Sequence, residues 1–327
     1  MSIKIIKAGM LATVQDAGRT GFRNIGVGSA GAMDLFAMKV ANYLCGNRGN
    51  EAVIEINFPA PEILFEQDAI ISITGAGFSA TLNQVTIPGW RTLFVKKESI
   101  LKFEKPVWGA RVYLAVSGGW QAEQWLGSYS THLKLAVAGH GGRALKKNDE
   151  VQFSKPVLSF TENKILPWLI SAAELDIVYE PLNEIRCVAG PEFSLLTVSA
   201  KRSFENQEMI ISSQSDRMGY RLNNVPLSLD TALELISSPV DAGTVQLLPS
   251  GKLIILMADH QTTGGYPRIA AVIKADLPKL AQARPGLAVN FTMLSIGEAE
   301  NSYTKMLLNL EEIKKACHLN LKNILSS

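Results

Sequence analysis

A loop rich in hydrogen-bonding side chains follows an apolar segment in the second half of the chain. The segment 253–257 (LIILM) leads into Asp259 and His260, and the residues after them are mostly polar or glycine. His260 titrates near neutral pH, so it could act as an acid or a base, with Asp259 or Asp216 orienting it. Adjacent glycines would let a ligand approach the backbone closely. The alternative is a polar hairpin whose groups satisfy one another. The candidate substrate-binding residues of this loop are Gln261, Thr262, Gly264, Gly265, Tyr266 and Arg268.

A second polar cluster, residues 212–221 (SSQSDRMGYR), carries two arginines four residues apart. Arg217 and Arg221 could present planar guanidinium groups to a carboxylate or a phosphate. We therefore predict Arg221 as a substrate-binding residue, and His260, Asp216 and Arg217 as the catalytic set. The structural alternative stays open here, because Asp216 could equally hold Arg217 in an ion pair.

Several other chemistries lack support in the sequence. Residues 26–31 (GVGSAG) match the dinucleotide pattern G-x-G-x-x-G, but the residues before them are polar and broken by glycines. That pattern requires a buried strand directly before the first glycine. The four histidines show no metal-ligand spacing, so no metal site is expected. A phosphate-binding G-x-x-x-x-G-K-[ST] loop is also missing from the sequence.

The elements that must position these residues are mostly strands. Short apolar segments such as 69–74 (AIISIT) and 112–116 (VYLAV) alternate with glycine- and proline-bearing turns, which favours a mainly β protein with few helices. Helical patterns are limited to 33–45, a short helix with Asp276 as its N-cap, and 301–318, with an apolar stripe of Leu307, Leu310, Ile313 and Cys317.

The sequence also suggests an ancient duplication on either side of a proline-containing linker, residues 155–181. The motif QDAGRTGFR at 15–23 has an echo in SDRMGYR at 215–221. Two similar β domains follow from this, and we expect barrels because closure removes exposed strand edges. The predicted domains are residues 1–160, residues 182–298 with the proposed cleft, and a C-terminal helix at 299–327.

Composition and charge narrow the class of protein. The net charge is +2, from 32 basic and 30 acidic residues, and no block of lysine and arginine stands out. We therefore expect neither a nucleic acid nor a membrane as partner. No apolar run approaches the roughly 20 residues of a membrane span. Three widely spaced cysteines argue against a disulfide framework and for a reducing compartment, so a cytoplasmic location is predicted.

Six motifs in order resemble the family of the 5-oxoprolinase C subunit. That family is also labelled allophanate hydrolase subunit 2, KipI antagonist or biotin-dependent carboxyltransferase. The motifs extend from about residue 5 to residue 291, and the resemblance implies two cyclophilin-like β-barrel domains. It also places SDRMGYR and HQTTGGYP in a cleft of the second domain. The motifs are TVQDAGRTGF, GSAGAMDLFAMKVANYLCGN, YLAVSGGW, LGSYST, SDRMGYRL and HQTTGGYPRIA.

The resemblance further implies a component of an ATP-dependent hydrolase that opens the cyclic amide 5-oxo-L-proline to L-glutamate. Its partners would be a B-type subunit (allophanate hydrolase subunit 1 or KipI-like) and an A-type subunit, and the chain would be inactive alone. ATP with magnesium, shared with the partner subunits, is the expected cofactor, and no cofactor is expected to be bound covalently.

Two alternatives remain open. One is the carboxyltransferase subunit of a biotin-dependent urea or amide carboxylase, which alone would require biotin. The other is a non-enzymatic regulatory binder of the KipI-antagonist kind. The chain contains no biotin-carboxylase segment and no biotinyl Met-Lys-Met context, which favours 5-oxoprolinase over carboxyl transfer.

Overall fold

The computed structural model describes residues 2–154, 160–231 and 235–325. The chain divides into two compact units, and neither is continuous in sequence. Unit 1 comprises Met1–Arg19, Ala30–Ala172 and Leu308–Ser327, and unit 2 comprises Thr20–Ser29 and Ala173–Leu307.

The predicted linker, residues 155–181, contains the point where the chain passes from unit 1 to unit 2 after Ala172. Its residues 155–159 lie outside the described part of the chain. The remainder includes strand β10 (Lys164–Ile165) and helix α2 (Ala172–Tyr179). The linker is therefore partly built into regular structure.

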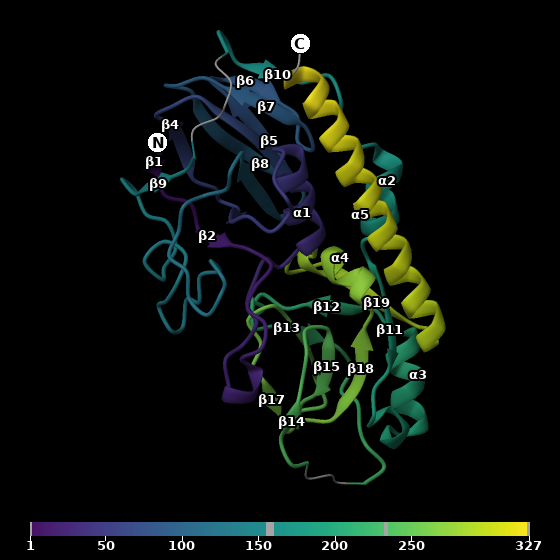
Figure 1. The fold of residues 1–327 in the computed structure, drawn as a ribbon. Coiled ribbons are helices and arrows are strands. Elements are labelled where there is room, and N and C mark those ends of the chain that lie inside the picture. Colours follow the sequence, from purple (N-terminus) through teal and green to yellow (C-terminus); the bar gives the residue numbers. More distant parts are fainter. Residues whose placement is uncertain (1, 155–159, 232–234, 326–327) are drawn as a thin grey trace. The chain divides into compact units, whose positions relative to one another are not determined.

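Unit 1 is dominated by one ten-stranded sheet, seen in the upper part of Figure 1. Its two long strands, β5 (Ala69–Leu82) and β8 (Ile100–Val116), pair antiparallel along most of their length, with irregular register near Gly75 and Gly77. The other strands before β10 are β1 (Ser2–Lys7), β2 (Leu11–Gln15), β3 (Val53–Asn57), β4 (Glu62–Phe65), β6 (Val85–Ile87), β7 (Thr92–Val95) and β9 (Glu150–Gln152).

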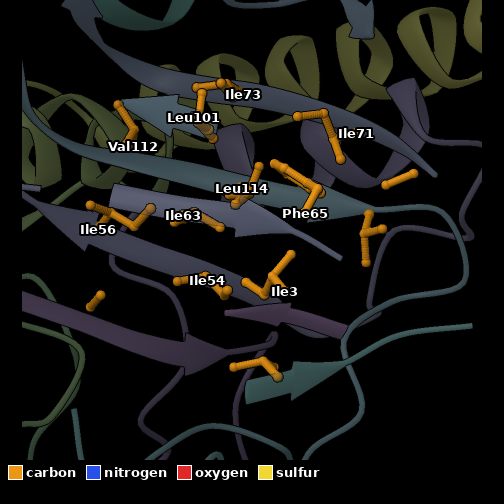
Figure 2. Close-up of a cluster of buried hydrophobic side chains, with 14 of the residues drawn as sticks. Ile3, Ile54, Ile56, Ile63, Phe65, Ile71, Ile73, Leu101, Val112 and Leu114 are labelled. Atoms are coloured by element: carbon orange, nitrogen blue, oxygen red, sulfur yellow. The ribbon is translucent and has the colours of Figure 1, made fainter. Parts of the chain in front are cut away.

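The core of unit 1 is made by apolar side chains from most of these strands. Figure 2 shows Ile3, Ile54, Phe65 and Leu114 among side chains that gather from neighbouring strands. Their burial removes most of the apolar surface of the sheet from water, which is the main stabilising contribution to such a unit.

Helix α1 (Leu35–Leu44) begins where the sequence predicts a helix. The Asp34 side chain caps it by accepting a hydrogen bond from the Ala37 amide. The hydroxyls of Ser72 and Thr74 on β5 donate to backbone carbonyls of the helix. Helix and sheet are thus joined by both packing and hydrogen bonds.

Unit 2 contains a closed seven-stranded barrel, so the mainly β fold class and a closed barrel are confirmed. Residues alternate between the barrel interior and its outer face: Tyr220 and Leu222 are buried, whereas Arg221 is exposed. In spatial order the strands are β11 (Glu184–Ala189), β18 (Arg268–Val272), β15 (Thr244–Leu247), β16 (Leu253–Leu256), β13 (Gly219–Asn223), β12 (Met209–Ile211) and β19 (Ala288–Met293). A separate pair is formed by β14 (Ser238–Pro239) and β17 (Thr263–Gly264).

Three further helices are α3 (Val198–Asn206), α4 (Leu277–Gln282) and α5 (Ile296–Leu325). Helix α5 is longer at both ends than the predicted 301–318. Its buried stripe includes Leu310, Ile313 and Cys317 as predicted, but Leu307 is 38% exposed and Met306 is buried in its place. Among the described residues, none of the helices combines the length and the apolar character required to cross a membrane.

Asp276 stands at the N-cap of α4, but its side chain makes no capping hydrogen bond, so the predicted capping role is wrong. The carboxylate is fully buried and accepts hydrogen bonds from the Arg186 backbone amide at 2.8 Å and from its Nη2 at 2.5 Å. The Lys279 Nζ lies 3.7 Å from it and donates to the Glu184 carbonyl. The Asp276 carboxylate therefore bonds Arg186 on β11, through stronger, charge-assisted hydrogen bonds, and does not cap α4.

Candidate functional site

A cavity of about 590 Å³ opens on the outer face of the barrel in unit 2. Its wall includes four of the residues that the sequence predicts, namely Asp216, Arg221, Gln261 and Tyr266. Gln246 and Ile254 also line it, from strands β15 and β16. The two polar loops chosen from the sequence therefore contribute to one cavity.

Strand register places Arg221 in one row of side chains with Ile254 and Gln246. Arg221 on β13 is paired with Ile254 on β16, Ile254 with Gln246 on β15, and Gln246 with Arg268 on β18. Directly paired residues of antiparallel strands lie on the same face of a sheet. The row consequently runs Arg221, Ile254, Gln246 across three adjacent strands. The register between β15 and β18 shifts between Val245 and Gln246, so the pairing of Gln246 with Arg268 does not extend the row to Arg268.

Arg221 and Arg268 have different surroundings. Arg268 Nη2 lies 2.8 Å from Glu192 Oε1 and Arg268 Nε lies 3.1 Å from Glu192 Oε2, which makes a two-point ion pair. Arg221 is exposed and forms no ion pair with any residue that the structure describes. Arg221 is therefore the cation of the cavity that can bind an anionic ligand without breaking an existing pair.

Asp216 shapes the turn that leads into β13. Its Oδ1 accepts hydrogen bonds from the amides of Met218, at 2.8 Å, and Gly219, at 3.2 Å. Asp16, its counterpart in the proposed duplication, likewise accepts a hydrogen bond from the amide two residues later, that of Gly18. Carboxylates that bond their own following backbone stabilise such turns.

Arg217 connects the two polar loops. Its Nε and Nη2 lie 2.8 and 3.0 Å from the two carboxylate oxygens of Asp259, and the Asp259 amide donates to the Arg217 carbonyl at 2.8 Å. The guanidinium is almost wholly buried. We call this two-point ion pair between Arg217 and Asp259 the clamp. It fixes the segment bearing Asp216 against the segment bearing Gln261.

His260 is not among the residues of the cavity wall, and its side chain is 2% exposed. Its Nδ1 is 2.6 Å from the Gln261 carbonyl oxygen and its Nε2 is 3.8 Å from Asp241 Oδ1. Because a carbonyl only accepts, Nδ1 carries the proton and Nε2 is the basic nitrogen. Arg23, from the segment of the first half that belongs to unit 2, contacts Asp241 at 3.4 Å and donates to the Val240 carbonyl.

The burial of His260 should lower the pH at which its imidazole takes up a proton. Burial lowers the pKa of His260 below its ordinary value of about 6.5, and nearby Arg23 adds to this, although the Gln261 carbonyl, Asp241 and Asp259 oppose it. Between the two pKa values the unfolded chain binds a proton that the folded chain does not. Stability should therefore fall as pH drops through about 6.5. A ¹H–¹⁵N NMR titration of the imidazoles should give His260 a midpoint below the ordinary histidine value of about 6.5, and a midpoint at or above that value would contradict this.

The remaining predicted residues belong to the loop between Gln261 and β18. The Thr262 carbonyl accepts a hydrogen bond from the Val240 amide, and Gly264 pairs with β14. Gly265 and Tyr266 line a neighbouring cavity of about 650 Å³. Sequence reasoning missed Gln246, although a glutamine inside the apolar run 244–248 (TVQLL) was a signal for an outward-facing strand position.

Within the described residues, no group of three or more His, Cys, Asp or Glu side chains could hold a metal ion together. The cavity wall contains a guanidinium, amides and a phenol, which can bind an organic anion. It also contains the Asp216 carboxylate, whose Oδ1 bonds the amides of its own turn.

A family model described as "Carboxyltransferase domain, subdomain A and B" matches residues 25–293. The chain belongs to the carboxyltransferase family. The resemblance to the 5-oxoprolinase C subunit is also confirmed. The chain is 40% identical to the C subunit of 5-oxoprolinase from Escherichia coli over 298 residues, which cover 91% of this chain and 93% of that protein. It is 36% identical to the protein of the same name from Haemophilus influenzae, over 96% of this chain and 98% of that protein.

Among solved structures, the chain resembles Kluyveromyces lactis urea carboxylase with a TM-score of 0.84 and 26% sequence identity. The match covers 95% of this chain but only 29% of the urea carboxylase chain. The carboxyltransferase fold thus occurs both as a chain of this length and as part of much longer proteins.

Proposed function

We propose that this carboxyltransferase-family chain is the C subunit of an ATP-dependent 5-oxoprolinase, which opens 5-oxo-L-proline to L-glutamate. The observation that supports this most is the 40% identity to the Escherichia coli protein over nearly the whole of both chains. The proposed complex contains a B-type and an A-type subunit, and uses ATP with magnesium shared with those partners. The chain alone is inactive in this proposal.

The cavity suits the chemistry of this substrate. A lactam is a poor electrophile, so ring opening needs its carbonyl oxygen phosphorylated or strongly polarised. Opening adds the elements of water across the C–N bond, and ATP hydrolysis consumes a second water. We propose that Arg221 binds the substrate carboxylate, because it is the cation of the cavity without an ion pair among the described residues.

Carboxyl transfer to urea or another amide is the second candidate. It is favoured by the structural similarity to urea carboxylase, at a TM-score of 0.84. The lower identity, 26% against 40%, and the small share of the urea carboxylase chain that is matched rank it below 5-oxoprolinase.

The test uses the chain purified with its B-type and A-type partners. We expect glutamate formation from 5-oxoproline coupled to ATP hydrolysis in the complex, and none from the chain alone. Arg221→Ala should lower kcat/KM of the complex about 10- to 100-fold, because charged hydrogen bonds contribute about 1.5–3 kcal/mol. Arg221→Lys should recover part of it.

The matched control is Arg202→Ala, which removes an exposed arginine on α3 outside the cavity and should leave kcat/KM unchanged. A complex that carboxylates urea from carboxybiotin and forms no glutamate would reject the proposal in favour of the second candidate. Unchanged kinetics in Arg221→Ala would remove Arg221 from the substrate site.

A further inference from the structure

Gln246 contributes a buried side-chain amide to the cavity wall, and no described residue accepts a hydrogen bond from its nitrogen. The residue is 1% exposed and is paired with Ile254 at the end of the row. Within the described residues, no acceptor lies within hydrogen-bonding distance of its Nε2. Buried polar groups without partners are rare in proteins, because they lose hydration and gain nothing in return.

A glycine, Gly264, lies directly beside this amide. A Cβ added to Gly264 would lie 2.6 Å from Gln246 Nε2, so any larger residue there would displace the amide. Gly264 belongs to the same loop that contributes Gln261 and Tyr266 to the cavity wall. The loop therefore passes close to Gln246 while leaving its amide without a partner among the described residues.

The row also fixes what lies beside the amide. Arg221 is two strands away from Gln246, roughly 9–10 Å between Cα atoms at the usual strand spacing. Ile254 stands between them on the same face. A cation, an apolar side chain and an amide donor are thus arranged in one line across the cavity wall.

We propose that Gln246 is a specificity residue, whose Nε2–H donates to the carbonyl oxygen of a small ligand while Arg221 binds the carboxylate of that ligand. The ligand class is a small carboxylate with an amide or lactam carbonyl and an apolar ring or chain that lies over Ile254. The choice of 5-oxoproline as the probe rests on the proposed function, but binding requires neither ATP nor a partner protein.

The test is isothermal titration calorimetry on the full chain with two probes. The first is 5-oxo-L-proline, and the second is cyclopentanecarboxylate, which keeps the ring and the carboxylate but lacks the carbonyl. Gln246→Leu should weaken binding of 5-oxoproline about tenfold and leave binding of cyclopentanecarboxylate unchanged. Gln246→Met, which keeps an unbranched side chain, should behave in the same way and serves if the leucine variant does not fold.

Gln207→Leu is the matched control, because the Nε2 of Gln207 is also buried without an acceptor in the described residues but lies outside this cavity. It should bind both probes as the unchanged chain does. Unaltered 5-oxoproline affinity in both Gln246 variants would overturn the assignment, as would an equal loss for the two probes.

These outcomes separate the site from the proposed function. If the isolated chain binds 5-oxoproline through Gln246 but the complex forms no glutamate, the proposed function fails and the site stands. If the complex forms glutamate but Gln246-dependent binding is missing, the function stands and the role of Gln246 is rejected.

Discussion

Replacing Asp276 with alanine is expected to lower the free energy of unfolding of unit 2 by about 3–5 kcal/mol. The carboxylate is fully buried, bonds the Arg186 guanidinium and lies near the Lys279 ammonium. Its loss leaves a buried ammonium and a partly buried guanidinium without their counter-charge. Burial already lowers the pKa of Lys279, and removing the carboxylate that opposes this shift would lower it further.

The measurement must report on unit 2. All five tryptophans, at positions 90, 108, 120, 125 and 168, belong to unit 1, so tryptophan fluorescence follows that unit. Amide hydrogen exchange of β11 and α4 reports on the region around Asp276 directly. Glu205→Ala, which removes an exposed carboxylate on α3 of the same unit, is the matched control and should change protection little. Equal protection in Asp276→Ala and the unchanged chain would show that this charge cluster contributes no stability.

Arg217→Ala is expected to lower kcat/KM of the complex about 30- to 1000-fold, equivalent to about 2–4 kcal/mol. Arg217 acts here as a positioning residue, because its two-point ion pair with Asp259 fixes the segments that bring Asp216 and Gln261 to the cavity. Without it, the partly buried Asp259 carboxylate lacks this counter-charge and the two segments can separate. Arg217→Lys should recover only part of the activity, because an ammonium cannot form two parallel hydrogen bonds to one carboxylate.

A double-mutant cycle with Asp259→Asn distinguishes this role from a general loss of structure. The two substitutions should be strongly non-additive in kcat/KM, since each breaks the same clamp. Melting curves of every variant separate unfolding from loss of positioning. Additive losses, or activity that declines only with the folded fraction, would count against the clamp.

The sequence predicted the fold through local signals. Short apolar segments between glycine- and proline-bearing turns predicted strands, and the residues from Met33 to Cys45 predicted α1 close to its observed limits. The stripe of α5 was wrong at Leu307, because Met306, four residues before Leu310, is the apolar residue that is buried there. The capping role of Asp276 was wrong because its buried partner, Arg186, lies 90 residues earlier in the chain.

The candidate site, like the fold, was predicted where it depends on residues close in sequence. Both polar loops were identified because their residues are close in sequence, and four of those residues line one cavity. The partners that connect them depend on how distant strands are paired. The Arg217–Asp259 clamp and the place of Gln246 in the row follow from that pairing, which local patterns do not encode. The approach of Arg23 to Asp241 likewise joins segments far apart in the sequence.

The discontinuity of unit 1 has a consequence for synthesis on the ribosome. Leu321, from the segment 308–327, packs with Ile70, Phe94 and Leu166 in a cluster that the earlier part of unit 1 cannot complete by itself. Domains usually fold in the order in which they are made, the N-terminal one first. Unit 1 is synthesised first, but it cannot complete its packing until the segment 308–327 has left the ribosome. Until then, the apolar surface that Leu321 covers is exposed. Nascent chains stalled after Ala172 should therefore be substrates for chaperones that bind exposed apolar surface.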